Sequence, residues 1–156
     1  MRWLFLIMVL GGCGETRYVR YVAPHPHVEL QPKRGVRLKL DMHAIEDQLK
    51  VDSDEGDVIV KDWRGTLAAA YSNSLREQFP RVAGLPVLTI ELLEAKPIYA
   101  ANVKLRFRAR LIDSAGNLLA SSQGTVAGRG DDLTTATASA VERMFEQLAA
   151  ELLGAL

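Results

Sequence analysis

The strongest constraint on the fold is the segment from Val103 to Leu111, in which apolar and charged residues alternate without a break. A period of two is typical of a β-strand that buries one face and exposes the other. The apolar positions are Val103, Leu105, Phe107, Ala109 and Leu111. The charged positions, expected on the opposite face, are Lys104, Arg106, Arg108 and Arg110. Such a strand needs a sheet around it and a second layer over its apolar side.

Other regions also have strand patterns. Residues 36–42 alternate in the same way, and a strand at 85–95 is expected to end before Pro97. Segments 49–51 and 58–60 flank the acidic stretch 52–57, which predicts a hairpin. A turn at 113–117, with Gly116 supplying a positive φ, leads to a return strand at 118–127. The spacing of Glu91 and Glu94 places them on opposite faces of their strand, which argues against a pair of glycosidase carboxylates.

Two segments have the apolar spacing of helices that bury one side. The first begins at Asp62, a good N-cap, and runs to about Phe79, before Pro80. The second begins with Asp131 or Asp132 as its cap and extends nearly to the C-terminus. Its expected buried face comprises Leu133, Thr137, Ala140, Val141, Met144, Phe145, Leu148 and Leu152. The order of elements predicts an α+β fold: a mixed, mostly antiparallel four-stranded sheet with two helices packed on one face.

The first twelve residues have the pattern of a signal peptide. Arg2 supplies a positive charge, residues 3–10 are apolar, and Gly11 and Gly12 are small. The apolar run is too short to span a bilayer, which takes about 20 residues. The sequence Leu10-Gly11-Gly12-Cys13 resembles the lipobox of bacterial lipoproteins, which implies that Cys13 is acylated and becomes the first residue of the mature protein. The alternatives are a plain signal peptide or a buried strand, each with an incidental cysteine.

These features divide the sequence into a signal peptide with a lipobox at 1–12, an acylated tether at 13–34 and a single α+β domain at 35–156. The tether contains three prolines and is expected to be extended, with a short edge strand at Tyr18–Val22 as an option. Cys13 is the only cysteine, so its acylation would leave no thiol for catalysis, redox chemistry or zinc binding. Since 19 basic residues balance 19 acidic ones, net charge predicts no attraction to nucleic acid.

The order of these features, from the lipobox through Gly35-Val36-Arg37-Leu38-Lys39-Leu40 to the alanine-rich last helix, resembles that of YajG-type lipoproteins. More loosely, the chain is similar to the auxiliary lipoproteins of ABC-type lipid transporters and to the lipoprotein plug of the lipopolysaccharide export machine. The resemblance covers about Gly35 to Ala150 and implies a bacterial outer-membrane lipoprotein that faces the periplasm. It brings no catalytic residues. Gly14, where an inner-membrane retention signal would usually have Asp, favours the outer membrane by the same resemblance.

Other motifs are weaker candidates for sites. His25 and His27 form an H-x-H pair without further ligands nearby, and residues 52–57 have only part of the pattern of a calcium loop. Residues 129–131 spell the adhesion tripeptide Arg-Gly-Asp, but they precede a helix that needs a carboxylate cap. The sequence offers no group of polar residues that would converge in an active site. We therefore expect no catalysis, no cofactor and no metal.

The expected function is that of a lipid-anchored envelope protein whose periplasmic domain is a non-catalytic binding or scaffolding component of a transport or assembly system. The alternative is a stand-alone periplasmic binder of an anionic ligand, such as a lipid, lipopolysaccharide or a cell-wall fragment. The candidate site is the face formed by Lys104, Arg106, Arg108 and Arg110, which is either a solvated surface balanced by Glu91 or a docking surface. If the strand at 36–42 lies in the same sheet with its apolar side toward the helices, Arg37 and Lys39 join this face. Expected partners are the membrane, through acylated Cys13, an envelope protein complex and anionic lipid.

Overall fold

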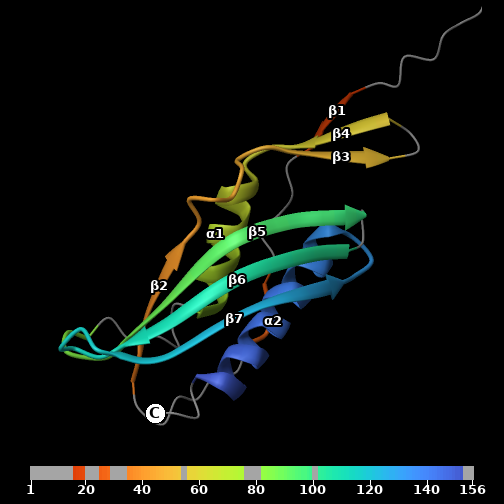
Figure 1. The fold of residues 1–156 in the computed structure, drawn as a ribbon. Helices are drawn as coiled ribbons and strands as arrows, with labels where there is room; N and C mark the ends of the chain where they lie inside the picture. Colours follow the sequence, from red (N-terminus) through yellow and green to blue (C-terminus); the bar gives the residue numbers. More distant parts are fainter. Residues whose placement is uncertain are drawn as a thin grey trace, which may run out of the picture.

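The strands of the computed structural model form two sheets. Figure 1 shows the smaller sheet, at the upper right, above one end of the larger sheet. The structure describes residues 16–19, 25–28, 35–53, 56–75, 82–99 and 102–152. The strands within these ranges are β1 (Arg17–Val19), β2 (Arg37–Asp41), β3 (Leu49–Ser53), β4 (Gly56–Val60), β5 (Val87–Tyr99), β6 (Asn102–Ile112) and β7 (Leu118–Arg129). The helices are α1 (Trp63–Leu75) and α2 (Leu133–Glu151).

The larger sheet contains four strands in the order β2-β5-β6-β7. β2 is parallel to β5, whereas the pairs β5–β6 and β6–β7 are antiparallel. The predicted α+β fold with a mixed, mostly antiparallel four-stranded sheet is therefore confirmed. The turn between β6 and β7 also follows the sequence pattern, because Gly116 has a φ of 91° and Asp113 accepts hydrogen bonds from the backbone of Ala115 and Asn117.

The smaller sheet contains three strands in the order β1-β4-β3. The hairpin of β3 and β4 agrees with the prediction from the acidic stretch between them, and Val51 pairs with Val58 across it. β1 adds to the outer edge of β4 in parallel, so that Arg17 pairs with Val58 and Val19 with Val60. Residues from the predicted tether therefore extend this sheet.

The predicted buried side of the last helix is confirmed. Its residues from Leu133 to Leu152 that were expected to be buried are all buried, and Ala136 joins them. α2 packs closely on β7 because Gly128 has no side chain: a Cβ there would overlap the helix backbone at Ala136 and Ala140. Asp132 caps the helix, and its carboxylate accepts a hydrogen bond from the backbone of Thr135 at 2.7 Å.

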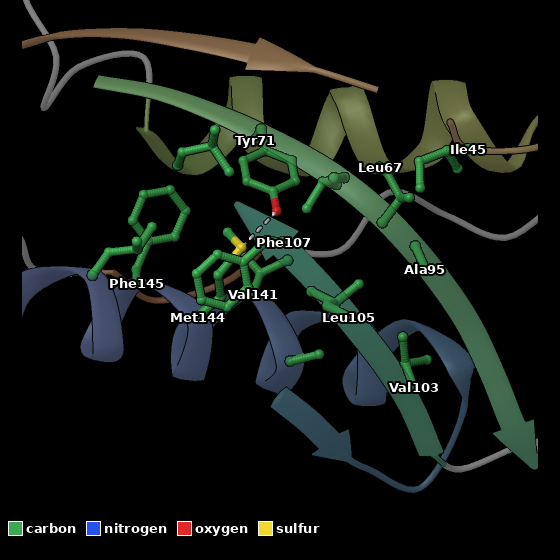
Figure 2. Close-up of a cluster of buried hydrophobic side chains, with 14 of the residues drawn as sticks. Ile45, Leu67, Tyr71, Ala95, Val103, Leu105, Phe107, Val141, Met144 and Phe145 are labelled. Atoms are coloured by element: carbon green, nitrogen blue, oxygen red, sulfur yellow. Dashed lines mark hydrogen bonds between the residues drawn. The ribbon is translucent and has the colours of Figure 1, made fainter. Parts of the chain in front are cut away.

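α1 joins the same hydrophobic core. Figure 2 shows Tyr71 of α1 pointing toward Met144 of α2, with Phe107 of β6 nearby. The Tyr71 hydroxyl lies 3.6 Å from the Met144 sulfur, and its ring lies 6.0 Å from that of Phe145. Burial raises the pKa of Tyr71, so the phenol stays neutral. These contacts place residues of both helices in one hydrophobic core, which two helices packed on the same face of the sheet would also do.

The start of α1 and the length of β5 refine the prediction. Asp62 precedes the helix with a φ of 56°, and its carboxylate packs so closely on Gly65 that a Cβ there would overlap it. The predicted end at Phe79 lies outside the described residues.

The expectation that β5 ends before Pro97 is wrong, because Pro97 pairs with Val103 in register. A proline fits there because β2 pairs only with the first part of β5, up to Glu91, so Pro97 lies where the strand lacks that neighbour.

Residues 25–28, in the middle of the predicted tether, lie against the domain. Pro26 and Val28 are buried, and Val28 belongs to the hydrophobic core. The backbone N–H of His27 donates a hydrogen bond of 2.6 Å to the carboxylate of Glu142 on α2. Together with β1, this contact shows that the chain before Gly35 packs on the domain at two places.

Candidate functional site

The outward face of the four-stranded sheet, on the side away from the core, carries the four basic residues singled out by the sequence. Along β6 the apolar residues are buried, whereas Arg106, Arg108 and Arg110 are exposed and Lys104 is partly exposed. Because side chains alternate along a strand, all four project from the same side of the sheet. The burial pattern agrees with the predicted alternation of this strand.

A β-bulge changes which acids share this face. The prediction that Glu91 and Glu94 lie on opposite faces of β5 is wrong, because the register shifts between Leu92 and Glu94. Glu91 pairs with Arg108 and Glu94 pairs with Arg106, so both carboxylates project with the cations of β6. The extra residue of the bulge is Leu93, which reverses the alternation of the residues that follow it, up to a second register shift after Pro97. The consecutive leucines at 92 and 93 were the sequence signal for this break.

Three ion pairs connect the two acids to the basic residues. Glu94 lies 3.6 Å from the Lys104 ammonium and 3.7 Å from Arg106, and Glu91 lies 3.5 Å from Arg108. The arginine side chains are about half exposed, so solvent screens these pairs and each contributes at most about 1 kcal/mol. They relieve the repulsion between neighbouring cations without closing the face to a partner.

The end of the outward face nearest the β6–β7 turn carries cations that lack such compensation. Thr89 lies between Lys39 of β2 and Arg110 of β6, and all three belong to one row across the sheet. Among the described residues, neither Lys39 nor Arg110 takes part in an ion pair. In the next row toward the turn, Arg37 of β2 lies beside three apolar residues in register, Val87, Ile112 and Leu118. Leu118 is 58% exposed. Basic and apolar groups therefore lie next to each other at this end, which we call the distal end of the outward face.

A small cleft opens beside the bulge. It has a volume of about 160 Å³, and its walls come from the loop 44–46, Leu49, residues 93–96 of β5 and Arg106. Its polar groups are the carboxylates of Glu46 and Glu94 and the cations of Lys96 and Arg106. The volume is below the roughly 300–1,000 Å³ of sites for drug-sized ligands. The cleft is therefore sized for one small polar group.

The remaining candidates from the sequence do not come together as a site. Cys13 lies outside the described residues, as does part of the acidic stretch 52–57. His25 and His27 are exposed, and the described part of the chain contains no cluster of three or more His, Cys, Asp or Glu residues that could hold a metal. Asp132, next to the Arg-Gly-Asp tripeptide, caps α2, and hydrogen bonds from Thr135 hold the pKa of its carboxyl below the usual value.

No family model and no curated protein matches the sequence. One similar solved structure, described as an uncharacterized protein, has a TM-score of 0.52 and 13% identity, and the match covers 87% of this chain and 95% of that one. At this identity the similarity shows the fold alone. Within the described residues, no helix combines the length and apolar character needed to cross a membrane.

Proposed function

We propose that the chain is a lipoprotein, anchored in the bacterial outer membrane through acylated Cys13, whose domain faces the periplasm. Its domain serves as a non-catalytic binding or scaffolding component of an envelope transport or assembly system. The anchor is supported by the apolar run at 3–10, the small residues Gly11 and Gly12 and the cysteine that follows them. Acylation adds at least two chains, and two chains are enough for stable membrane attachment.

The observation that carries the binding role is the charge of the outward face. Basic side chains outnumber acidic ones on it, since Glu91 and Glu94 compensate only the part around Arg106 and Arg108. Arg110 lies one row from the exposed Leu118, and Lys39 lies in the row of Arg110 on the edge strand β2. A partner with acidic and apolar groups fits this mixture, because arginine can bind a carboxylate with two hydrogen bonds while the leucine is covered.

The cleft beside the bulge favours a second candidate function, a stand-alone binder of a small anionic ligand. Lys96 and Arg106 supply the cations, and about 160 Å³ accommodates a phosphate or carboxylate group rather than a lipid. The carboxylates of Glu46 and Glu94 line the same space and oppose an anion. We therefore rank the protein-docking role first.

The test is capture of the acylated protein with its partners from detergent-solubilised envelopes. Mass spectrometry of the mature N-terminus should find lipid on Cys13, and unmodified protein beginning at another residue would contradict the anchor. The double variant Lys39→Glu/Arg110→Glu should lose the captured partner while its unfolding midpoint stays unchanged. The matched control is Arg64→Glu, an exposed charge reversal on α1. Retention of the partner by the double variant would contradict docking at the distal end.

A further inference from the structure

The three-stranded sheet has one face in the core and one face in solvent. Val19, Leu49 and Val60 pack inward. The opposite face, which we call the outer face of the small sheet, comprises Tyr18, Lys50, Asp57, Ile59 and Lys61. Tyr18, Ile59 and Lys50 form one row across β1, β4 and β3, and Lys61 follows two residues after Ile59. Tyr18 is 60% exposed, and both lysines are exposed.

The chain between Cys13 and β1 is short. β1 begins at Arg17, four residues after Cys13, and four residues of fully extended chain span at most about 14 Å. A tether free up to Gly35 would instead reach roughly 75 Å. Because β1 is paired with β4 and residues 25–28 are packed on α2, that longer reach is not available to the folded protein. An anchor at Cys13 therefore holds the small sheet close to the bilayer.

The chemistry of the outer face suits the headgroup region of a membrane. The Lys61 ammonium lies 4.3 Å from the centre of the Tyr18 ring, which holds the aromatic and the cation together. Tyrosine prefers the membrane interface because its ring is apolar and its hydroxyl is polar, and lysine attracts phosphate. We propose that the outer face of the small sheet rests on the phospholipid headgroups of the membrane in which Cys13 is anchored. This proposal depends on the acylation of Cys13 proposed above.

The acidic residues in the hairpin of β3 and β4 limit how this contact forms. Asp57 pairs with Lys50 at 2.8 Å, so part of its charge is neutralised. The other acids of residues 52–57 disfavour free adsorption to a negatively charged surface. The acyl chains therefore supply the attachment, and Tyr18 and Lys61 set which side of the domain faces the lipid. The distal end of the outward face then lies away from the bilayer, because Figure 1 shows the β6–β7 turn at the opposite end of the molecule from β1.

Lipid-quenching measurements on the acylated full chain test the proposal. Acylation blocks the thiol of Cys13, the only native cysteine, so an introduced cysteine can be labelled alone. A fluorophore on Lys50→Cys reports on the small sheet, and one on Ser114→Cys reports on the exposed β6–β7 turn. Both proteins are reconstituted in phosphatidylcholine vesicles that contain lipid with a nitroxide on its headgroup. We expect several-fold stronger quenching at position 50 than at position 114.

A second pair of variants separates the contribution of the face from that of the short connection. Adding Tyr18→Ala and Lys61→Glu to the position 50 reporter should lower its quenching by about half or more, while circular dichroism shows an unchanged fold. Lys39→Glu, a matched charge reversal on the other sheet, should leave the quenching as it is. Equal quenching at positions 50 and 114 in acylated, folded protein would overturn this proposal and leave the anchor intact. Protein without lipid on Cys13 would overturn both.

Discussion

The two sheets differ in how their strands find their partners. In the four-stranded sheet, β5, β6 and β7 are 11 to 13 residues long and follow one another as antiparallel neighbours. In the three-stranded sheet no strand exceeds five residues, and β1 pairs in parallel with β4, which lies about forty residues further along the chain. Long local strands bury a continuous apolar face, whereas short strands depend on contacts with the rest of the core. We infer that the larger sheet contributes most of the free energy of unfolding, and that packing against it positions the smaller sheet.

The largest expected effect is in the core under the larger sheet. Phe107 is 1% exposed and lies close to Tyr71 and Met144 (Figure 2). Phe107→Ala should lower the free energy of unfolding by about 3–5 kcal/mol, since it removes a buried aromatic ring and leaves a cavity. Urea denaturation followed by circular dichroism measures the loss.

The matched variant in the smaller sheet is Leu49→Ala, at a residue that is 6% exposed. Its loss should fall near the lower end of the range for such substitutions, about 2 kcal/mol, because β3 is an edge strand with fewer neighbours. An equal or larger loss for Leu49→Ala than for Phe107→Ala would contradict the division of stability between the two sheets.

The same comparison explains how much of the fold the sequence could predict. The alternation at 103–111 and the apolar stripe of the last helix identified β6 and the buried side of α2, because both depend on periodicity within one segment. The pairing of β1 with β4 could not be predicted, because three residues carry too little pattern and their partner is distant. The docking of Pro26 and Val28 was missed for the same reason: an isolated proline or valine in a polar segment has no period.

The candidate site was predicted in part. The four basic residues of β6 were identified with their face, but Glu94 was assigned to the wrong side. An assignment by alternation assumes a strand without bulges. A bulge inserts one extra residue and moves the residues after it to the opposite face. Lys39 was expected on this face only if its strand joined the same sheet, and its position in the row of Arg110 follows from the parallel pairing of β2 with β5. Sequence patterns give the face of a residue within one strand, whereas its neighbours on that face depend on the order of the strands.

A smaller effect is expected from Glu94→Gln on the outward face. The carboxylate of Glu94 pairs with Lys104 and Arg106, at 3.6 and 3.7 Å. Its neutralisation should change the free energy of unfolding by less than about 1 kcal/mol, because these pairs are long and partly exposed to solvent. The same change should raise the salt concentration that elutes the protein from immobilised polyphosphate. Glu146→Gln, at an exposed site on α2, is the control. A stability loss well above this range would mean that Glu94 holds the bulge rather than balancing charge.

The smallest expected effect concerns the pH dependence of stability that comes from the N-cap of α2, the helix that packs on the larger sheet. Hydrogen bonds from the Thr135 backbone and hydroxyl hold the pKa of Asp132 below its ordinary value of 3.8. Because the folded pKa lies below the unfolded one, the unfolded chain binds the proton more readily. The stabilisation by the charged cap is therefore fully present above about pH 4 and is lost as the pH falls through the folded pKa.

An asparagine in place of this aspartate would still accept a hydrogen bond from Thr135 but would not titrate. The difference in unfolding free energy between the native chain and Asp132→Asn should thus shrink between pH 7 and pH 3, as measured by urea denaturation at each pH. A difference that stays constant over this range would show that the carboxylate's charge does not contribute to the cap, and that α2 is held on the sheet by packing alone.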